Sequence, residues 1–217
     1  MSESSTLVTA AHFEYLAART RRDDAFLASL RAAARDAGLP PISIAPEQAS
    51  FLQILLRAAA AKEVVEVGTL GGYSAIAMAR ALPPGGQVRT IESEERHAAF
   101  ARAWIARSDV ADRVRVHHGK GMDVLPSFEP DSADAAFLDA DKASYPDYLG
   151  ESLRIVRKGG LVMVDNAFAF GQLLDRHPRD REVEAVRAFN EVMARDDRLQ
   201  SVIVPIGDGV WVGVRLR

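Results

Sequence analysis

The chain has 217 residues, of which 48% are hydrophobic and 26% charged, with a formal net charge of −3 and no cysteine. This length and composition predict one globular domain with a sizeable core. The lack of cysteine excludes disulfides, thiolate metal sites and cysteine nucleophiles, and the net charge gives no general attraction to nucleic acid or anionic membranes. The first ten residues are polar and no apolar run is long enough to span a membrane, so a cytoplasmic protein is expected.

Residues 9–37 have apolar side chains at helical spacing, and a glycine and two prolines follow. The pair Asp23-Asp24 is expected to divide this segment into two helices. The resulting N-terminal helical cap, residues 1–45, could cover a site, form a dimer surface or simply pack on the sheet. Residues 46–217 are expected to form a Rossmann-like core within the same domain.

The core alternates between strand and helix patterns. Strands are expected at 63–67, 87–91, 114–118, 133–138 and 161–164, and helices at 46–60, 73–82, 94–108, 122–125, 145–156 and 182–195. Lys158-Gly159-Gly160 is interpreted as a turn before the fifth strand. Segments 200–205 and 210–215 flank Gly207-Asp208-Gly209, which predicts a hairpin. The predicted fold is an α/β, doubly wound, seven-stranded sheet, mostly parallel with an antiparallel C-terminal hairpin.

The segment 63–74 reads EVVEVGTLGGYS and predicts a buried strand, a glycine turn and a helix N-terminus, an arrangement that receives nucleotides and nucleosides. Gly68, Gly71 and Gly72 do not fit G-x-G-x-x-G, because position 70 is leucine. Glu66 would repel a pyrophosphate but suits an ammonium or sulfonium group, which favours S-adenosylmethionine (SAM). A β-turn-α junction without any ligand is the alternative.

Acidic residues follow several of the predicted strands. Glu92 ends the second strand, where a carboxylate accepts hydrogen bonds from ribose hydroxyls. Glu94 and Glu95 are neighbouring alternatives that would instead stabilise the start of a helix. The assignment of the ribose to Glu92 is therefore a prediction about one of three adjacent carboxylates.

Asp139 follows the fourth strand, and Asp165-Asn166 follow the fifth. If these strands are neighbours, two carboxylates and an amide oxygen converge into a set suited to Mg²⁺, Mn²⁺ or Ca²⁺. The alternative is that these residues only cap helices. Lys142, three residues beyond Asp139, could act as a general base beside a cation, or could be an ordinary surface lysine.

Several motifs together resemble the metal-dependent SAM O-methyltransferase family, which includes the catechol and caffeoyl-CoA O-methyltransferases. The resemblance covers the chain from about residue 46 to its C-terminus. It is carried by Glu66-Val67-Gly68-Thr69, Gly72-Tyr73-Ser74, Asp139-Ala140-Asp141-Lys142 with Tyr145 and Tyr148, Lys158-Gly159-Gly160, Asp165-Asn166 with Gly171, and Pro205-Ile206-Gly207-Asp208-Gly209.

The resemblance implies a role for each matching residue. The methionine part of SAM would be held by Glu66, Gly68, Thr69, Gly72, Tyr73 and Ser74, the ribose by Glu92, and the adenine would lie beside Gly121. Asp139, Asp165 and Asn166 would bind Mg²⁺, and Asp139 would also lie near the cofactor. The cation would lower the pKa of an acceptor hydroxyl whose proton passes to Lys142. The residues after Asn166 lack the tryptophan common in the plant enzymes, so a phenylpropanoid-CoA acceptor is not expected.

The acceptor implied by this resemblance is a small catechol-like or vicinal-dihydroxy compound, and a homodimer is expected. A tRNA hydroxyuridine methyltransferase of the same fold is a second hypothesis, for which Arg176, His177, Arg179 and Arg181 would supply a basic surface. A third is an NAD-type oxidoreductase or a cofactor-binding protein without catalysis. The missing G-x-G-x-x-G pattern counts against this third hypothesis.

Overall fold

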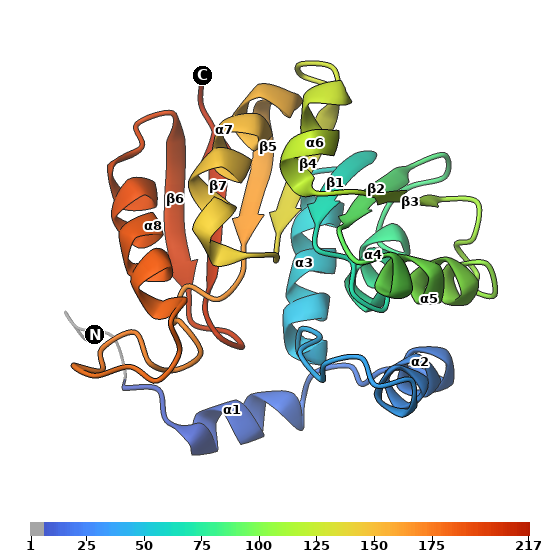
Figure 1. Ribbon diagram of the computed structural model, residues 1–217, viewed down its shortest axis with the longest axis horizontal. Coiled ribbons are helices and arrows are strands. Elements are labelled where there is room, and N and C mark those ends of the chain that lie inside the picture. The colour runs from blue at the N-terminus through green and yellow to red at the C-terminus, as the bar shows by residue number, and fades with distance from the viewer. Residues whose placement is uncertain (1–6) are drawn as a thin grey trace.

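A computed structural model describes residues 7–217 (Figure 1). Residues 1–6, part of the expected N-terminal cap, lie outside this range. The helices are α1 (Ala10–Ala17), α2 (Ala25–Asp36), α3 (Pro46–Ala58), α4 (Tyr73–Ala79), α5 (Glu95–Ile105), α6 (Gly121–Val124), α7 (Tyr145–Ile155) and α8 (Val183–Arg195), with 3₁₀ turns η1 (Leu125–Ser127) and η2 (Lys142–Ser144). The strands are β1 (Glu63–Val67), β2 (Gln87–Glu92), β3 (Val114–His118), β4 (Ala133–Leu138), β5 (Val156–Val164), β6 (Leu199–Val204) and β7 (Val210–Arg215).

The seven strands form one sheet in the order β3-β2-β1-β4-β5-β7-β6. Strands β1 to β5 run parallel, and β7 pairs antiparallel with both β5 and β6. This confirms the predicted doubly wound sheet with its antiparallel hairpin. The chain builds outward from β1 in one direction and from β4 in the other. The gap between these two strands is thus the switch point at which such sheets bind ligands, beyond the carboxyl ends of the strands.

Both faces of the sheet are covered by helices. Since adjacent residues of a strand point to opposite sides, neighbouring apolar residues pack into different layers. On one face Val64 packs with residues of α2, α3, α4 and α5. On the other face Val65 packs with residues of α6, α7 and α8. Figure 1 shows α6, α7 and α8 in front of the strands in this view. Continuous burial on both faces explains why β1 reads as an almost uninterrupted apolar run.

Two local predictions from the sequence, a helix boundary and a turn, can be compared with the structure. The expected division of residues 9–37 is confirmed, because Asp24 caps α2 by accepting a hydrogen bond from Leu27 N at 2.9 Å. The predicted turn at Lys158-Gly159-Gly160 is wrong, since these residues lie within β5. The pairing of β5 with β4 shifts register there, and Gly159 has a φ of 76°, which only a bulged strand with glycine accommodates readily.

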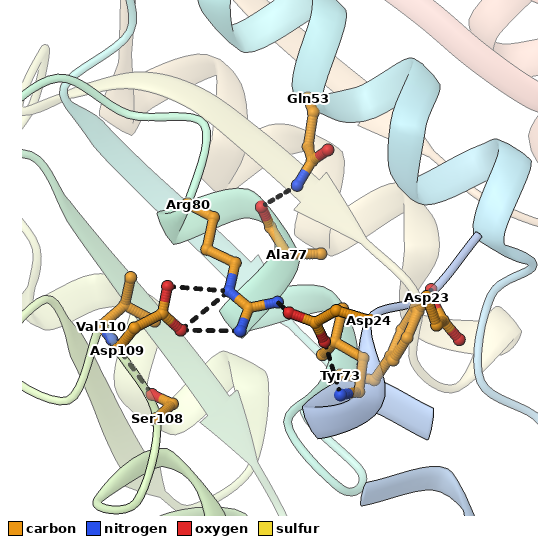
Figure 2. A network of polar contacts seen from close by, with 10 residues as sticks. Asp23, Asp24, Gln53, Tyr73, Ala77, Arg80, Ser108, Asp109 and Val110 are labelled. Atoms are coloured by element: carbon orange, nitrogen blue, oxygen red, sulfur yellow. Dashed lines mark hydrogen bonds and ion pairs between the residues drawn. The ribbon is translucent and has the colours of Figure 1, made fainter. Parts of the chain in front are cut away.

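The N-terminal segment is fastened to the outer end of α4 by a polar network (Figure 2). Arg80 pairs with Asp24 at 3.1 Å and with Asp109 at 2.7 Å. Gln53 of α3 donates to the carbonyl oxygen of Ala77 at 2.7 Å. Because α4 begins at the glycine turn, these contacts hold the helix whose first residues face the site. Within residues 7–217, no helix has the length and apolar character needed to cross a membrane.

Candidate active site

A cavity of about 1120 Å³ opens at the carboxyl ends of β1, β2, β4 and β5. This exceeds the roughly 300–1,000 Å³ typical of a site for one ligand, so a cofactor and a small second molecule fit together. Ten of the residues singled out from the sequence line it: Gly68, Thr69, Tyr73, Ser74, Glu92, Gly121, Asp139, Lys142, Asp165 and Asn166. The sheet topology therefore brings most of the predicted site to one place.

Two glycines in the wall of the cavity are required by close packing. A Cβ on Gly68, whose φ is 101°, would lie 1.9 Å from the backbone oxygen of Asp139. A Cβ on Gly121 would lie 2.5 Å from the ring of Tyr148. The strand ends of β1 and β4 thus meet at a separation that no side chain permits. At this contact the wall of the cavity is formed by backbone atoms of Gly68 and Asp139.

Glu92 is the best placed of the three adjacent carboxylates at the end of β2. It is buried, and its oxygens accept hydrogen bonds from Leu70 N at 2.7 Å and from Glu94 N at 3.0 Å. Glu94 also faces the cavity, whereas Glu95 instead pairs with His118 at 2.8 Å. Each Glu92 oxygen keeps a second lone pair for a ligand hydroxyl. This carboxylate therefore adds to the hydrogen bonds that hold the glycine turn against the end of β2, such as Gly68 N to the Ile91 carbonyl at 2.9 Å.

Two predicted cofactor residues, Glu66 and Gly72, do not line the cavity, and a third, Tyr73, lines it but directs its hydroxyl elsewhere. Glu66 is completely buried and does not line it, and Gly72 packs on Ala101 and Ile105 at the start of α4. Tyr73 reaches the wall, but its hydroxyl donates to Asp23 at 2.6 Å. Arg31 stacks on the Tyr73 ring at 3.8 Å. It also donates to the Ile44 carbonyl at 2.6 Å, so Tyr73 helps to anchor the loop before α3.

The Glu66 carboxyl group predicts a measurable dependence of stability on pH. Burial raises its pKa to about 7 from 4.5, opposed by the hydroxyls of Ser74 and Thr90, neither of which makes a well-aligned hydrogen bond to it. The native state therefore holds this proton more tightly than the unfolded chain. The free energy of unfolding should fall as pH rises from about 4.5 to about 7, by about 3 kcal/mol, at about 1.4 kcal/mol per tenfold change in proton affinity.

The variant Glu66→Gln tests this because it removes the titration while keeping the shape. We expect it to be more stable than the wild type in urea unfolding at pH 8, and to have equal stability at pH 4.5. A variant that is less stable than the wild type at pH 8 would show that the ionised carboxylate is a stabilising group in the native state.

Asp139 and Asp165 follow neighbouring strands whose last residues, Leu138 and Val164, are paired. The Asp165 backbone N donates to the Leu138 carbonyl at 3.0 Å, which brings the two carboxyl-bearing residues to the same edge. Asp165 is only 5% exposed. Burial and then the negative charge of Asp139 raise the pKa of Asp165 to about 7. Two acidic groups held this close favour either a proton or a cation between them.

Lys142 is buried at the same edge rather than on the surface, with 5% of its area exposed. Its Nζ donates to Asp139 Oδ1 at 3.2 Å and to the Tyr145 hydroxyl at 2.7 Å. Burial, together with the nearby carboxylates, raises the pKa of Tyr145 well above its usual value, so this hydroxyl stays neutral. Besides its bond to Cε, Nζ has three tetrahedral positions, and these contacts use two of them. The third is available to a molecule in the cavity.

The donor set at this edge fits a hard divalent cation. Within residues 7–217 no group of three or more His, Cys, Asp or Glu side chains is arranged to hold a metal, so a site here needs the Asn166 amide beside the two carboxylates. Two carboxylate groups and one amide carbonyl are ligands of the kind that Mg²⁺ and Ca²⁺ accept. The like charges of Asp139 and Asp165 supply the electrostatic reason for binding a cation. The helix-capping alternative does not account for this convergence.

Two polar residues at this edge were not predicted as site residues. Gln48 of α3 donates to Asp165 Oδ1 at 2.7 Å, and Asp208 of the β6–β7 turn accepts from Asn166 Nδ2 at 3.0 Å. Sequence patterns concealed them because Gln48 lies on an apolar helix face and Asp208 lies in a turn where an aspartate is ordinary. The Gly207-Asp208-Gly209 motif was the available signal. The basic residues Arg176, Arg179 and Arg181 are exposed on the loop between β5 and α8.

Comparison with known proteins agrees with this geometry. A family model described as O-methyltransferase matches residues 17–216. A catechol O-methyltransferase of Niastella koreensis is 39% identical over 84% of this chain and 83% of its own, and one of Mycobacterium tuberculosis is 36% identical over 89% and 88%. The crystal structure of an O-methyltransferase from Bacillus cereus in complex with SAH is 33% identical, with a TM-score of 0.84 over 94% of this chain and 97% of that one. The chain belongs to the O-methyltransferase family.

Proposed function

We propose that this enzyme transfers a methyl group from SAM to a hydroxyl of a small catechol-like or vicinal-dihydroxy acceptor, with the help of Mg²⁺ or a similar divalent cation. The observation that carries the proposal is the meeting of Asp139, Lys142 and Asp165-Asn166 in the same cavity as the glycine turn and Glu92. The names of two relatives, both catechol O-methyltransferases, support the class of acceptor, and the SAH complex of a similar structure supports SAM as the methyl donor.

The cofactor half of the cavity is built from backbone and one carboxylate. Gly68 and Thr69 follow β1, Ser74 lies in the first turn of α4, and Glu92 ends β2. We assign the methionine portion to Gly68, Thr69 and Ser74, the ribose hydroxyls to Glu92, and the adenine to the wall at Gly121. Glu66 would act on the cofactor's positive charge through the protein, without contact, because it lies behind this wall.

The other half of the cavity would hold the cation and the acceptor. Asp139, Asp165 and Asn166 are the residues assigned to the cation. When bound there, a divalent cation supplies a Lewis acid that lowers the pKa of a nearby hydroxyl. A vicinal pair of hydroxyls suits such a site because two adjacent oxygens can occupy it together. The cation would add to the positive charge that Lys142, when protonated, places beside this acidic pair.

Lys142 is the proton acceptor in this proposal. In this proposal it enters the reaction as the neutral amine, with its two N–H groups donating to Asp139 and Tyr145 and its lone pair directed to the cavity. As the acceptor hydroxyl gives its proton to Lys142 Nζ, its oxygen forms a bond to the methyl carbon while the bond from that carbon to sulfur breaks. The chain contributes chiefly by alignment, which can supply several kcal/mol, about 7–11 in the best cases.

The proposal is tested by measuring SAM turnover with catechol, with phenol and with tRNA, each before and after treatment with EDTA. We expect methylation of catechol, loss of that activity with EDTA and recovery with added Mg²⁺. Phenol, which has a single hydroxyl, should be a far poorer acceptor. Catechol methylation that persists in EDTA would refute the cation, and turnover with tRNA alone would overturn the class of acceptor.

The expected homodimer is also part of this proposal. None of the residues of α1 is buried within one copy, and Tyr15 is 62% exposed. Figure 1 shows α1 beside the edge toward which β4 and β5 point. A second copy packed on α1 would shield these side chains close to the mouth of the site. Light scattering on the purified chain measures this directly.

A further inference from the structure

We propose that Gln48 and Asp208 are positioning residues that select which oxygen atoms Asp165 and Asn166 present to the cation. This inference rests on the function proposed above, since it concerns the same cation site. Neither residue is assigned to hold the cation itself. Gln48 acts on Asp165 and Asp208 acts on Asn166, each through one hydrogen bond.

Gln48 is buried, and its amide can have only one orientation. Its Oε1 accepts a hydrogen bond from the backbone N of Ala45 at 3.0 Å, and a backbone N–H can only donate. The Nε2 group therefore faces Asp165, and it donates to Oδ1 at 2.7 Å. One carboxylate oxygen of Asp165 is thereby engaged and held. The other oxygen is left to act as a ligand.

Asp208 fixes the orientation of the Asn166 amide in a similar way, but it does so as a hydrogen-bond acceptor, whereas Gln48 acts on Asp165 as a donor. Its carboxylate can only accept hydrogen bonds, so Asn166 must turn its Nδ2 toward it, at 3.0 Å. The carbonyl oxygen of Asn166, the atom that could bind a cation, then points away from Asp208. An ionised aspartate at position 208 therefore decides which end of the amide is offered to the site.

Asp208 also holds the loop that begins at Asn166. Its two oxygens accept from the backbone N of Phe170 at 2.7 Å and of Gly171 at 3.0 Å. Asn166, Ala169 and Phe170 have φ values of 64°, 52° and 60°, a region that L residues with side chains rarely adopt. A loop with three such residues needs partners that hold it, and Asp208 supplies them.

The two positioning residues meet at the β6–β7 turn. Gly207 has a φ of 57°, and a Cβ there would lie 2.1 Å from Cδ of Gln48. The turn is therefore pressed against the Gln48 amide while the next residue holds Asn166. The β6–β7 hairpin is distant in sequence from β5, but through these contacts it helps to orient Asp165 and Asn166, which follow β5. This gives the antiparallel hairpin a role in the site beyond covering the edge of the sheet.

The test compares Asp208→Asn and Gln48→Met with the wild type by Mn²⁺ binding, measured from the electron paramagnetic resonance signal of free Mn²⁺ in the presence of SAH. The two oxygens of Asp208 accept from Asn166 Nδ2, Phe170 N and Gly171 N, whereas Asn at 208 has one oxygen, so its NH₂ would face at least one of these donors and its hold on Asn166 and the loop would weaken. We expect each variant to raise the Kd for Mn²⁺ by about 10–100-fold, as loss of an outer partner of a metal ligand does.

The affinity for SAH, measured by calorimetry without metal, should stay the same in both variants, because neither residue contacts the glycine turn. Asp112→Asn is the matched control, since Asp112 is exposed before β3 and does not line the cavity. Mn²⁺ binding equal to the wild type in both variants would overturn the inference, and so would an equal loss of SAH and Mn²⁺ affinity. A wild-type chain that does not bind Mn²⁺ would instead refute the cation in the proposed function.

Discussion

Asp165→Ala should lower kcat for catechol methylation by at least about 100-fold, the upper end of what loss of an outer partner costs, because it removes a proposed ligand itself. The Kd for SAM should remain unchanged. Asp165 follows β5 at the acceptor side of the cavity, whereas the residues assigned to SAM lie after β1, in α4 and α6, and at the end of β2. Turnover by initial rates at saturating SAM and SAM binding by calorimetry measure the two effects separately.

Asp165→Asn and Glu92→Ala complete this experiment. Asn keeps the oxygen that accepts from Gln48 while losing the charge, so a loss of turnover in this variant reports the charge rather than the packing. Glu92→Ala should behave in the opposite way, with weaker SAM binding and unchanged Mn²⁺ binding. If Asp165→Ala weakened SAM binding as much as it slowed turnover, the division of the cavity into two halves would be wrong.

The parts of this fold that the sequence predicted are those set by local chemistry. The buried strand at 63–67, the glycine turn at Gly68 and the hairpin at Gly207-Asp208-Gly209 each follow from neighbouring residues. The approach of Asp139 to Asp165 required only one further assumption, that β4 and β5 are adjacent, and the strand order confirms it. Sheet topology then brought the acids together.

The parts that could not be predicted depend on contacts between distant segments. Gln48 meets Asp165 across 117 residues, and Asn166 meets Asp208 across 42. No local pattern marks such pairs. Glu66 shows the same limit, because its place two residues before Gly68 indicated a ligand contact, while packing buried it behind the cavity wall. The glycines after Lys158 likewise read as a turn, although they lie in a bulge of β5, between the residues Val156 and Leu161 that pair with β4.

Lys142→Met should lower kcat by about 10²–10⁴-fold, the usual contribution of a general base, with little change in SAM affinity. The methionine side chain has similar length and fills the buried space, but it cannot take a proton. Lys142→Arg is the informative companion, because arginine keeps the positive charge beside Asp139 but does not lose its proton in proteins. If proton transfer is the role of Lys142, both variants should be slow.

A more acidic acceptor separates proton transfer from packing. Nitrocatechol has already lost a hydroxyl proton at neutral pH, so it needs no base, and both Lys142 variants should regain much of their rate with it. Lys158→Met serves as the control, since Lys158 is exposed in the bulge of β5, away from the cavity. A loss of rate that is equal for catechol and nitrocatechol would show that Lys142 orders Asp139 and Tyr145 rather than accepting a proton. A wild-type rate in Lys142→Arg would refute the base outright, because arginine shares the charge and the hydrogen-bond donors of lysine but cannot take up a proton.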